Sequence, residues 1–249
     1  MKIWQIPSSG RQVLYALTAI LGLAVPSYGA LTYNLATDFS TVDNPNDVWS
    51  YNYGSTPITA MLTTSYAEGW SMRTDAGNSI LKTTVTGDGA NNWQKGDVIM
   101  HSSNVGDPNL VAVTWESPDA GTISIDGQAW GASIVSGREV KWTLTVNSTV
   151  IAGRDGLSGL VRDHADALFS NNLVGGQSLS GINVQMGDIV KFTVFSDTTT
   201  GSFAGVQQEI TFTPIPEPTT LIAGALLGIP FSIAAVRRLR QRRHGVGEA

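Results

Sequence analysis

The C-terminal segment from Pro214 onward limits most strongly what this chain can be. It contains an uncharged apolar stretch of eighteen residues, Thr219 to Val236, interrupted by Pro230. As a helix this stretch would reach roughly 27 Å, enough for a thin bilayer core, and membrane helices tolerate proline better than soluble ones. A basic cluster follows at Arg237, Arg238, Arg240, Arg242 and Arg243. The positive-inside bias therefore predicts a transmembrane helix over 219–236, with the tail 244–249 in the cytoplasm and everything before residue 214 outside.

A Pro-Glu-Pro tripeptide, Pro216, Glu217 and Pro218, stands directly before the apolar stretch. Two fixed φ angles and two missing N–H groups predict a semi-rigid, unpaired segment. The order of tripeptide, apolar span and arginine cluster over 214–243 resembles the PEP-CTERM sorting signal of Gram-negative bacteria. This resemblance implies that an exosortase, a membrane cysteine transpeptidase, cuts near the tripeptide and releases or transfers the preceding domain from the inner membrane. The alternative is an ordinary single-pass anchor after a proline-rich linker.

The N-terminus independently indicates export. Two basic residues precede an apolar run over 13–25, and small residues follow it. This is the layout of a secretory signal peptide over 1–29, with cleavage predicted between Gly29 and Ala30. The domain left between the two targeting segments spans 30–213.

The composition of residues 30–213 excludes several classes of partner and chemistry. Eight lysines and arginines stand against eighteen aspartates and glutamates, a net charge of −10, whereas the whole chain carries −5. A domain this acidic has too few basic residues to bind a phosphate backbone or anionic headgroups. We therefore expect neither nucleic acid nor anionic lipid as a partner. The chain has no cysteine, which excludes disulfides, thiol catalysis and thiolate metal sites.

Apolar residues in this domain alternate with polar ones, the period expected for half-buried strands. Each expected strand is bounded by Gly, Pro, Asn or Asp: 48–54, 98–101, 110–115, 121–126, 140–146, 149–152, 188–195 and 208–213. Asn147 and Ser148 predict a tight hairpin, because Asn tolerates the positive φ of such a turn. Residues 160–169 are expected to form a short helix or an irregular loop. The pattern predicts an all-β fold, a single jelly-roll-like β-sandwich.

Four segments carry a second resemblance. In chain order they look like parts of a domain that recurs in PEP-CTERM proteins and is similar to lectin-like and carbohydrate-binding β-sandwiches: 38–54, 113–125, 142–147 and 184–192. The resemblance implies the fold. Its strand and turn patterns carry little chemistry, so it implies no particular activity.

Aromatic residues offer one candidate binding site. Trp49, Tyr51 and Tyr53 lie at period two, so a strand presents all three rings on one face. Such a row could stack on sugar rings, or it could form one inner wall of the sandwich. Trp93 stands among Asn and Gln residues in a turn-like stretch, which makes it the tryptophan expected to be exposed as a ligand platform. Trp115 and Trp142 are expected in the core.

An oxygen-rich loop precedes the first expected strand. It contains Asp38, Asp43, Asn44, Asn46 and Asp47. Calcium takes six to eight oxygen ligands from such side chains, so the three aspartates are candidate ligands of a structural Ca²⁺. The spacing is not that of an EF-hand, and Asx-rich segments are also ordinary turn formers. We expect no other cofactor.

Motifs for catalysis are weak. Asp163, His164 and Asp166 offer a metal site or an acid–base pair, but a short cluster of this kind also fits a solvated turn, and His101 ends an expected strand with no acid beside it. The nucleophile elbow, the zinc-protease helix and the phosphate loop do not occur. Paired carboxylates for glycoside hydrolysis meet only in the fold. We therefore expect that the domain is not an enzyme. The preferred function is a structural or adhesive role in an extracellular polysaccharide layer; the alternatives are a carbohydrate-binding module and, after it, a polysaccharide hydrolase or lyase.

Overall fold

The computed structural model describes residues 29–88, 91–133, 138–157, 159–196, 198 and 200–215. Residues Ala30–Pro214 form one compact unit. Its helical segments, among the described residues, are two single 3₁₀ turns, η1 (Ala165–Ala167) and η2 (Phe169–Asn171). η1 lies within residues 160–169, where the sequence predicts a short helix or an irregular loop, and η2 begins at the last residue of that stretch. No helix in the described part of the chain is long and apolar enough to cross a membrane.

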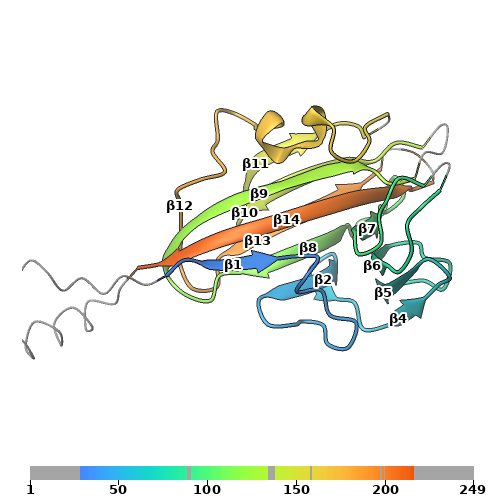
Figure 1. The fold of residues 1–249 in the computed structure, drawn as a ribbon, viewed down its shortest axis with the longest axis horizontal. Helices are drawn as coiled ribbons and strands as arrows, with labels where there is room; N and C mark the ends of the chain where they lie inside the picture. Colours follow the sequence, from blue (N-terminus) through green and yellow to red (C-terminus); the bar gives the residue numbers. More distant parts are fainter. Residues whose placement is uncertain are drawn as a thin grey trace, which may run out of the picture. The chain divides into compact units, whose positions relative to one another are not determined.

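The strands form two antiparallel sheets (Figure 1). The larger sheet contains eight strands in the order β12 (Ile182–Val184), β9 (Gly121–Gly131), β14 (Phe203–Pro214), β7 (Val98–His101), β6 (Ser79–Thr83), β5 (Ala67–Ser71) and β4 (Met61–Thr63), with β1 (Leu31–Asn34) also paired to β14. The smaller sheet contains six strands in the order β11 (Thr149–Arg154), β10 (Lys141–Val146), β13 (Ile189–Phe195), β8 (Val111–Glu116), β2 (Trp49–Tyr53) and β3 (Thr56–Pro57). The all-β prediction is confirmed.

The eight strands from β7 to β14 pair as one long folded ribbon. β7 pairs with β14, β8 with β13, β9 with β12, and β10 with β11. Rolling this ribbon up brings β14 beside β9 and β13 beside β10, which closes the two sheets. This is the strand order of a jelly roll. The earlier strands extend it, with β4, β5 and β6 beyond β7, and β2 and β3 beyond β8.

The tip of the ribbon is the predicted hairpin between β10 and β11. Asn147 has a φ of 53°, the left-handed conformation that Asn adopts more readily than most residues. Its side chain also binds the neighbouring strand, since its Oδ1 accepts from the Ile189 N–H at 2.9 Å and its Nδ2 donates to Asp188 at 3.0 Å. One residue thus makes the turn and fixes the start of β13.

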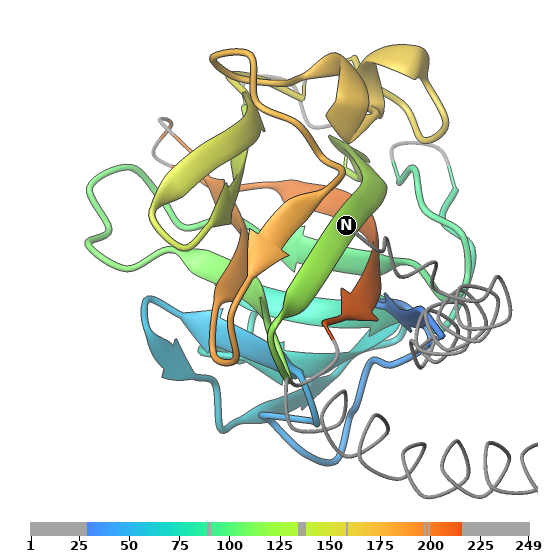
Figure 2. The same ribbon diagram turned by 90° about the vertical axis from the view of Figure 1, so that its left-hand side faces the viewer.

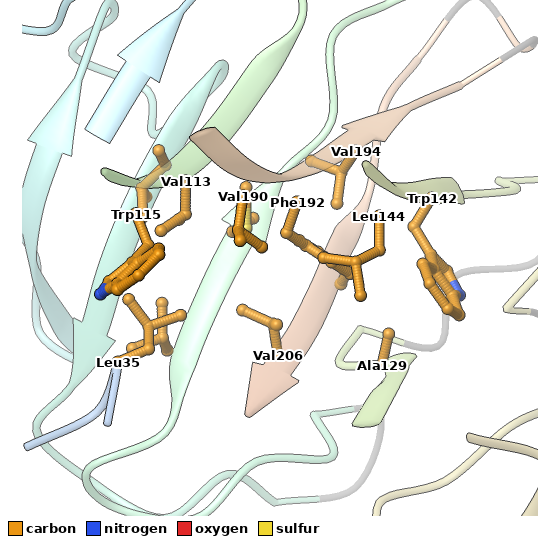
Figure 3. Packing of buried hydrophobic residues seen from close by; sticks show 14 of the residues in the cluster. Leu35, Val113, Trp115, Ala129, Trp142, Leu144, Val190, Phe192, Val194 and Val206 are labelled. Atoms are coloured by element: carbon orange, nitrogen blue, oxygen red, sulfur yellow. The ribbon is translucent and has the colours of Figure 1, made fainter. Parts of the chain in front are cut away.

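The main core lies between the two sheets. Inward side chains of β8, β13 and β10 face those of β9 and β14, as Figure 3 shows for Val113, Trp115, Phe192, Ala129 and Val206. The same alternation that predicted the strands therefore fills the space between the sheets.

Aromatic rings fill one end of this core. The ring of Trp142 lies 5.1 Å from that of Phe169 and 5.5 Å from that of Phe192, centroid to centroid. Phe169 comes from η2, which contacts β9, and the two views of the ribbon show this segment beside that strand (Figure 1, Figure 2). Trp115 and Trp142 are 0% and 1% exposed, so their predicted place in the core is confirmed.

A second, smaller apolar cluster covers part of the outer face of the larger sheet. Leu81 and Ile99 alternate along their strands with Ile80 and Met100, which belong to the main core, and so point to the opposite face. The loop after β6 folds over them and places Trp93 on this face. The larger sheet therefore carries apolar side chains on both faces here.

Candidate functional site

The aromatic row on β2 faces the core. Trp49 and Tyr51 are 1% and 0% exposed. The Trp49 Nε1–H donates to Asp38 at 3.2 Å, and the Tyr51 hydroxyl accepts from the backbone N–H of Ser40 at 3.2 Å. The prediction of a sugar platform is wrong for these two rings, which form an inner wall of the sandwich. The strand period places rings on one face, and the pairing of β2 with β8 decides which face that is.

Tyr53, the third ring of the row, lies at the end of β2 and is partly buried against the main core. Its hydroxyl donates to the Asp107 carboxylate at 2.7 Å. Burial raises the pKa of this phenol, and the adjacent carboxylate raises it further. The ring therefore anchors the loop before β8 through its hydroxyl.

Trp93 is buried, so the prediction that it is exposed is wrong. It is 6% exposed and packs against Tyr66 and Phe203, with centroid distances of 5.7 and 6.4 Å. The polar residues around it serve the turn: the Asn92 carbonyl accepts from the Trp130 indole at 2.6 Å, and the Gln94 N–H donates to Asp97 at 2.8 Å. The partners of Trp93 come from distant parts of the sequence.

All six tryptophans of the domain are buried. Their exposed fractions do not exceed 6%: Trp49, Trp70, Trp93, Trp115, Trp130 and Trp142. The described surface therefore offers no indole face on which a sugar ring could stack.

The oxygen-rich loop is used to close turns and a sheet edge. Asp38 accepts from the Asn34 N–H at 2.8 Å as well as from the Trp49 indole. The Asn44 side-chain amide hydrogen-bonds to backbone groups at the edge of the smaller sheet, as a neighbouring strand would. It accepts from the Tyr51 N–H at 2.8 Å and donates to the carbonyls of Tyr51 and Ile58 at 2.7 and 2.8 Å. The Asn46 amide donates to the Asp38 carbonyl at 3.0 Å.

These contacts occupy the side chains of Asp38 and Asn44 and the amide of Asn46. No group of three or more His, Cys, Asp or Glu that could hold a metal ion occurs among the described residues. Asp38, Asp43 and Asp47, the candidate calcium ligands, are therefore not brought together as a ligand set.

A polar network that the sequence did not indicate lies on the outer face of the larger sheet. Arg162 pairs with Asp97 at 3.2 Å through Nε and with Asp163 at 2.8 Å through Nη1. Gln128 lies between, donating to Asp163 at 2.8 Å and to Gln207 at 2.6 Å. The guanidinium carbon also lies 5.8 Å from the centre of the Trp130 ring.

This network joins the loop after β11 to the sheet. Asp97 is 4% exposed; its Oδ2 also accepts the Gln94 N–H, and its Oδ1 accepts from the Gln207 amide at 3.4 Å. Asp97 and Asp163 both lie against the Arg162 guanidinium, which offsets one of their two negative charges. A hydrolytic pair needs one carboxylic acid and one free carboxylate beside an open path to substrate. The arrangement suits holding the loop in place.

His164 caps a turn. Its Nδ1 accepts from the Asp166 N–H at 3.1 Å at the start of η1, and its side chain is 49% exposed. The Asp163, His164 and Asp166 cluster is therefore a solvated turn in the described structure, and Asp163 belongs to the network around Arg162.

Of the two histidines that the structure describes, His101 is the more buried. Its ring meets Phe203 edge to face, with 4.8 Å between centroids, and its Nδ1 lies 3.0 Å from the Ser102 carbonyl. Burial lowers the pKa of His101 below its usual value of 6.5. The unfolded chain therefore takes up this proton more readily than the folded one.

We expect His101 to make stability depend on pH. Its contribution is fully present above the unfolded-state pKa near 6.5 and is lost as pH falls through the lower folded-state pKa. Urea midpoints measured from pH 8 to 5 should fall, and His101→Gln should flatten part of that fall. Equal profiles for wild type and His101→Gln would contradict this reading.

The two ends of the folded unit lie side by side. Leu31 pairs with Phe212, and Pro214 pairs with Gly121 at the last position of the ladder. Gly29 and Ala30 are exposed directly before β1. The remaining predicted sorting features lie outside the described residues: the signal peptide up to residue 28, Pro216, Glu217, Pro218, the apolar span 219–236, the five arginines and the tail 244–249.

No family model and no curated protein matches the chain. Among solved structures, one match is the catalytic domain of a GH87 α-1,3-glucanase variant in complex with tetrasaccharides. The sequence identity is 11% and the TM-score 0.27, over 69% of this chain and 29% of that structure. The chain thus spans less than a third of the length of that protein, and a likeness this weak carries no argument about activity.

Proposed function

We propose that this chain is an exported domain, held at the inner membrane by the helix predicted over 219–236 and then trimmed by an exosortase at the Pro-Glu-Pro tripeptide. The proposal is carried by one observation: the folded unit begins just after the predicted signal-peptide cleavage site and ends just before the predicted exosortase site. β1 begins at Leu31, two residues after Gly29, and β14 ends at Pro214, two residues before Pro216. Both cuts would therefore leave every strand intact.

Outside the cell we propose a structural or adhesive role in the extracellular polysaccharide layer. The burial of all six tryptophans supports this role over a carbohydrate-binding module, because the described surface offers no exposed indole on which a sugar could stack. The pairing of the buried Asp97 with Arg162 supports it over a hydrolase or lyase, because this carboxylate is already held by a cation. The net charge of −10 over residues 30–213 keeps such a domain soluble.

Mass spectrometry of the mature protein, isolated from a host that makes an exosortase, tests the proposal. We expect an N-terminus at Ala30 and a C-terminus near Pro216 to Thr219, without the apolar span. Glu217→Ala should leave the full-length form in the membrane fraction, because it removes the one ionisable side chain of the tripeptide.

Glu116→Ala is the matched control, since Glu116 is an exposed acid at the end of β8. It should be processed like the wild type. Mature protein that still carries Leu221 to Val236 would show that the tail is a plain anchor.

A further inference from the structure

The larger sheet ends in β4, whose outer edge has no strand beside it in the described part of the chain. The Ser71 N–H donates to the Ala60 carbonyl at 3.0 Å, and the Thr64 N–H donates to the Ala67 carbonyl at 2.8 Å. In an antiparallel pair every second residue bonds to its neighbour, so Ala60, Leu62 and Thr64 bond towards β5. The backbone N–H and C=O groups of Thr59, Met61 and Thr63 therefore point away from the sheet.

The edges of β1, β11, β3 and β12 differ from that of β4. At β1, Asp38 takes up both outward groups of Asn34: it accepts from the Asn34 N–H at 2.8 Å and donates its own N–H to the Asn34 carbonyl at 2.9 Å. The edge of β11 is covered by residues 172–174, through the Gly153 N–H to the Asn172 carbonyl at 3.0 Å and the Val174 N–H to the Ile151 carbonyl at 3.1 Å. At β3, Pro57 has no N–H to offer, and the Asn44 amide occupies the carbonyl of Ile58.

At the far end of the larger sheet, β12 has three residues, and a turn lies directly before it and directly after it. Gly181 has a φ of 68°, and a turn follows in which the Gln185 N–H donates to Asp188 at 2.7 Å. β4 differs because its ladder continues to Ala60, so that the open edge runs from Thr59 to Thr63.

The β4 edge also lacks the charges that usually protect an open edge. From Thr56 to Ala67 there is no charged residue, in a domain whose net charge is −10. Thr59, Ala60 and Thr63 are exposed, and Met61 is 43% exposed. Natural sheets discourage edge pairing with lysine, proline or a bulge, and an edge without them tends to pair with another strand.

We propose that the β4 edge pairs antiparallel with the β4 edge of a second copy of this chain, so that two larger sheets join across a two-fold axis. Centred on residue 61, this pairing places Met61 opposite Met61 of the partner subunit and Thr59 opposite Thr63 of the partner subunit. We propose a second copy as the occupant because a two-fold axis places the outward N–H groups of one β4 edge opposite the outward C=O groups of the other. The same short run of residues then supplies both donors and acceptors. Copies that repel through their net charge meet here at a charge-free strip. The inference rests on the described fold and does not depend on export or processing.

Single cysteines test the pairing, because the chain has none of its own. In the proposed register the two Cα atoms at position 61 lie about 5.5 Å apart, within the range that a disulfide bridges. The full-length chain carrying Met61→Cys, purified in detergent and oxidised, should form a covalent dimer. Met72→Cys is the matched control, since Met72 is 50% exposed and lies next to β5 away from the edge. It should cross-link several-fold more slowly.

Sedimentation of the full-length chain over a concentration series gives an independent measurement. Wild-type protein should shift from the mass of one copy to that of two, and Met61→Lys should lose that shift because it places two positive charges face to face. Met72→Lys, which adds the same charge elsewhere, should behave as the wild type does. Equal cross-linking of the two cysteine variants, or an unchanged dimer in Met61→Lys, would overturn the proposal. Either result is expected if the copies associate through the apolar tail 219–236 instead of through β4.

Discussion

A chain that ends at Ser202, before β14, is expected to be unfolded. β14 pairs with β9 along its length, with β7 at one end and with β1 at the other. It contributes Val206, Ile210 and Phe212 to the core, each at most 1% exposed. Burying such a side chain stabilises by about 1.5–3 kcal/mol, so their loss alone approaches the 5–15 kcal/mol by which a domain is usually stable. Circular dichroism should show no cooperative thermal transition.

A chain that ends at Ile215 is the control and should melt as the full-length protein does, because every strand is present. A cooperative transition in the shorter chain would contradict the central place of β14.

The position of β14 at the end of the described domain also fixes the order of folding and cleavage under the proposed function. β14 can pair only after residue 214 has crossed the membrane, so the domain completes its fold after that step. An exosortase cut beyond residue 214 then leaves the fold unchanged.

Replacing Trp142 by alanine is expected to lower the free energy of unfolding by about 3–5 kcal/mol, the usual cost of truncating a buried tryptophan. Its ring packs against Phe169 of η2 and Phe192 of β13, which also contact each other. The change therefore opens a cavity between the smaller sheet and the segment beside β9. Denaturant unfolding followed by circular dichroism measures the loss.

Trp142→Phe should cost clearly less, because the indole N–H of Trp142 has no hydrogen-bond partner to lose. Met186→Ala serves as the surface control, with Met186 75% exposed, and should stay within about 0.5 kcal/mol of the wild type. If Trp142→Ala were as mild as this control, the aromatic stack would not be part of the stabilising core.

Local pattern was sufficient for eight of the described strands and for the tip of the fold, but it did not predict β1, β3, β4, β5, β6 or β12. Alternating side chains predict strands because the period of two is a property of the extended backbone itself. The turn at Asn147 follows from a preference for positive φ that needs no tertiary contact. The absence of cysteine and the acidic balance of residues 30–213 likewise excluded whole classes of chemistry without a structure.

The direction in which each row of side chains points was decided only by the tertiary structure. Trp49 and Tyr51 share a face by their spacing, but the pairing of β2 in the smaller sheet turned that face inward. Trp93 is buried because Tyr66 and Phe203, distant in sequence, meet it on the outer face of the larger sheet. The ion pair of Asp97 with Arg162 likewise joins two segments that no local pattern relates. Burial is set by which strands become neighbours when the ribbon rolls up, and that depends on pairings between residues far apart in the chain, whereas the sequence pattern records only what each short segment favours by itself.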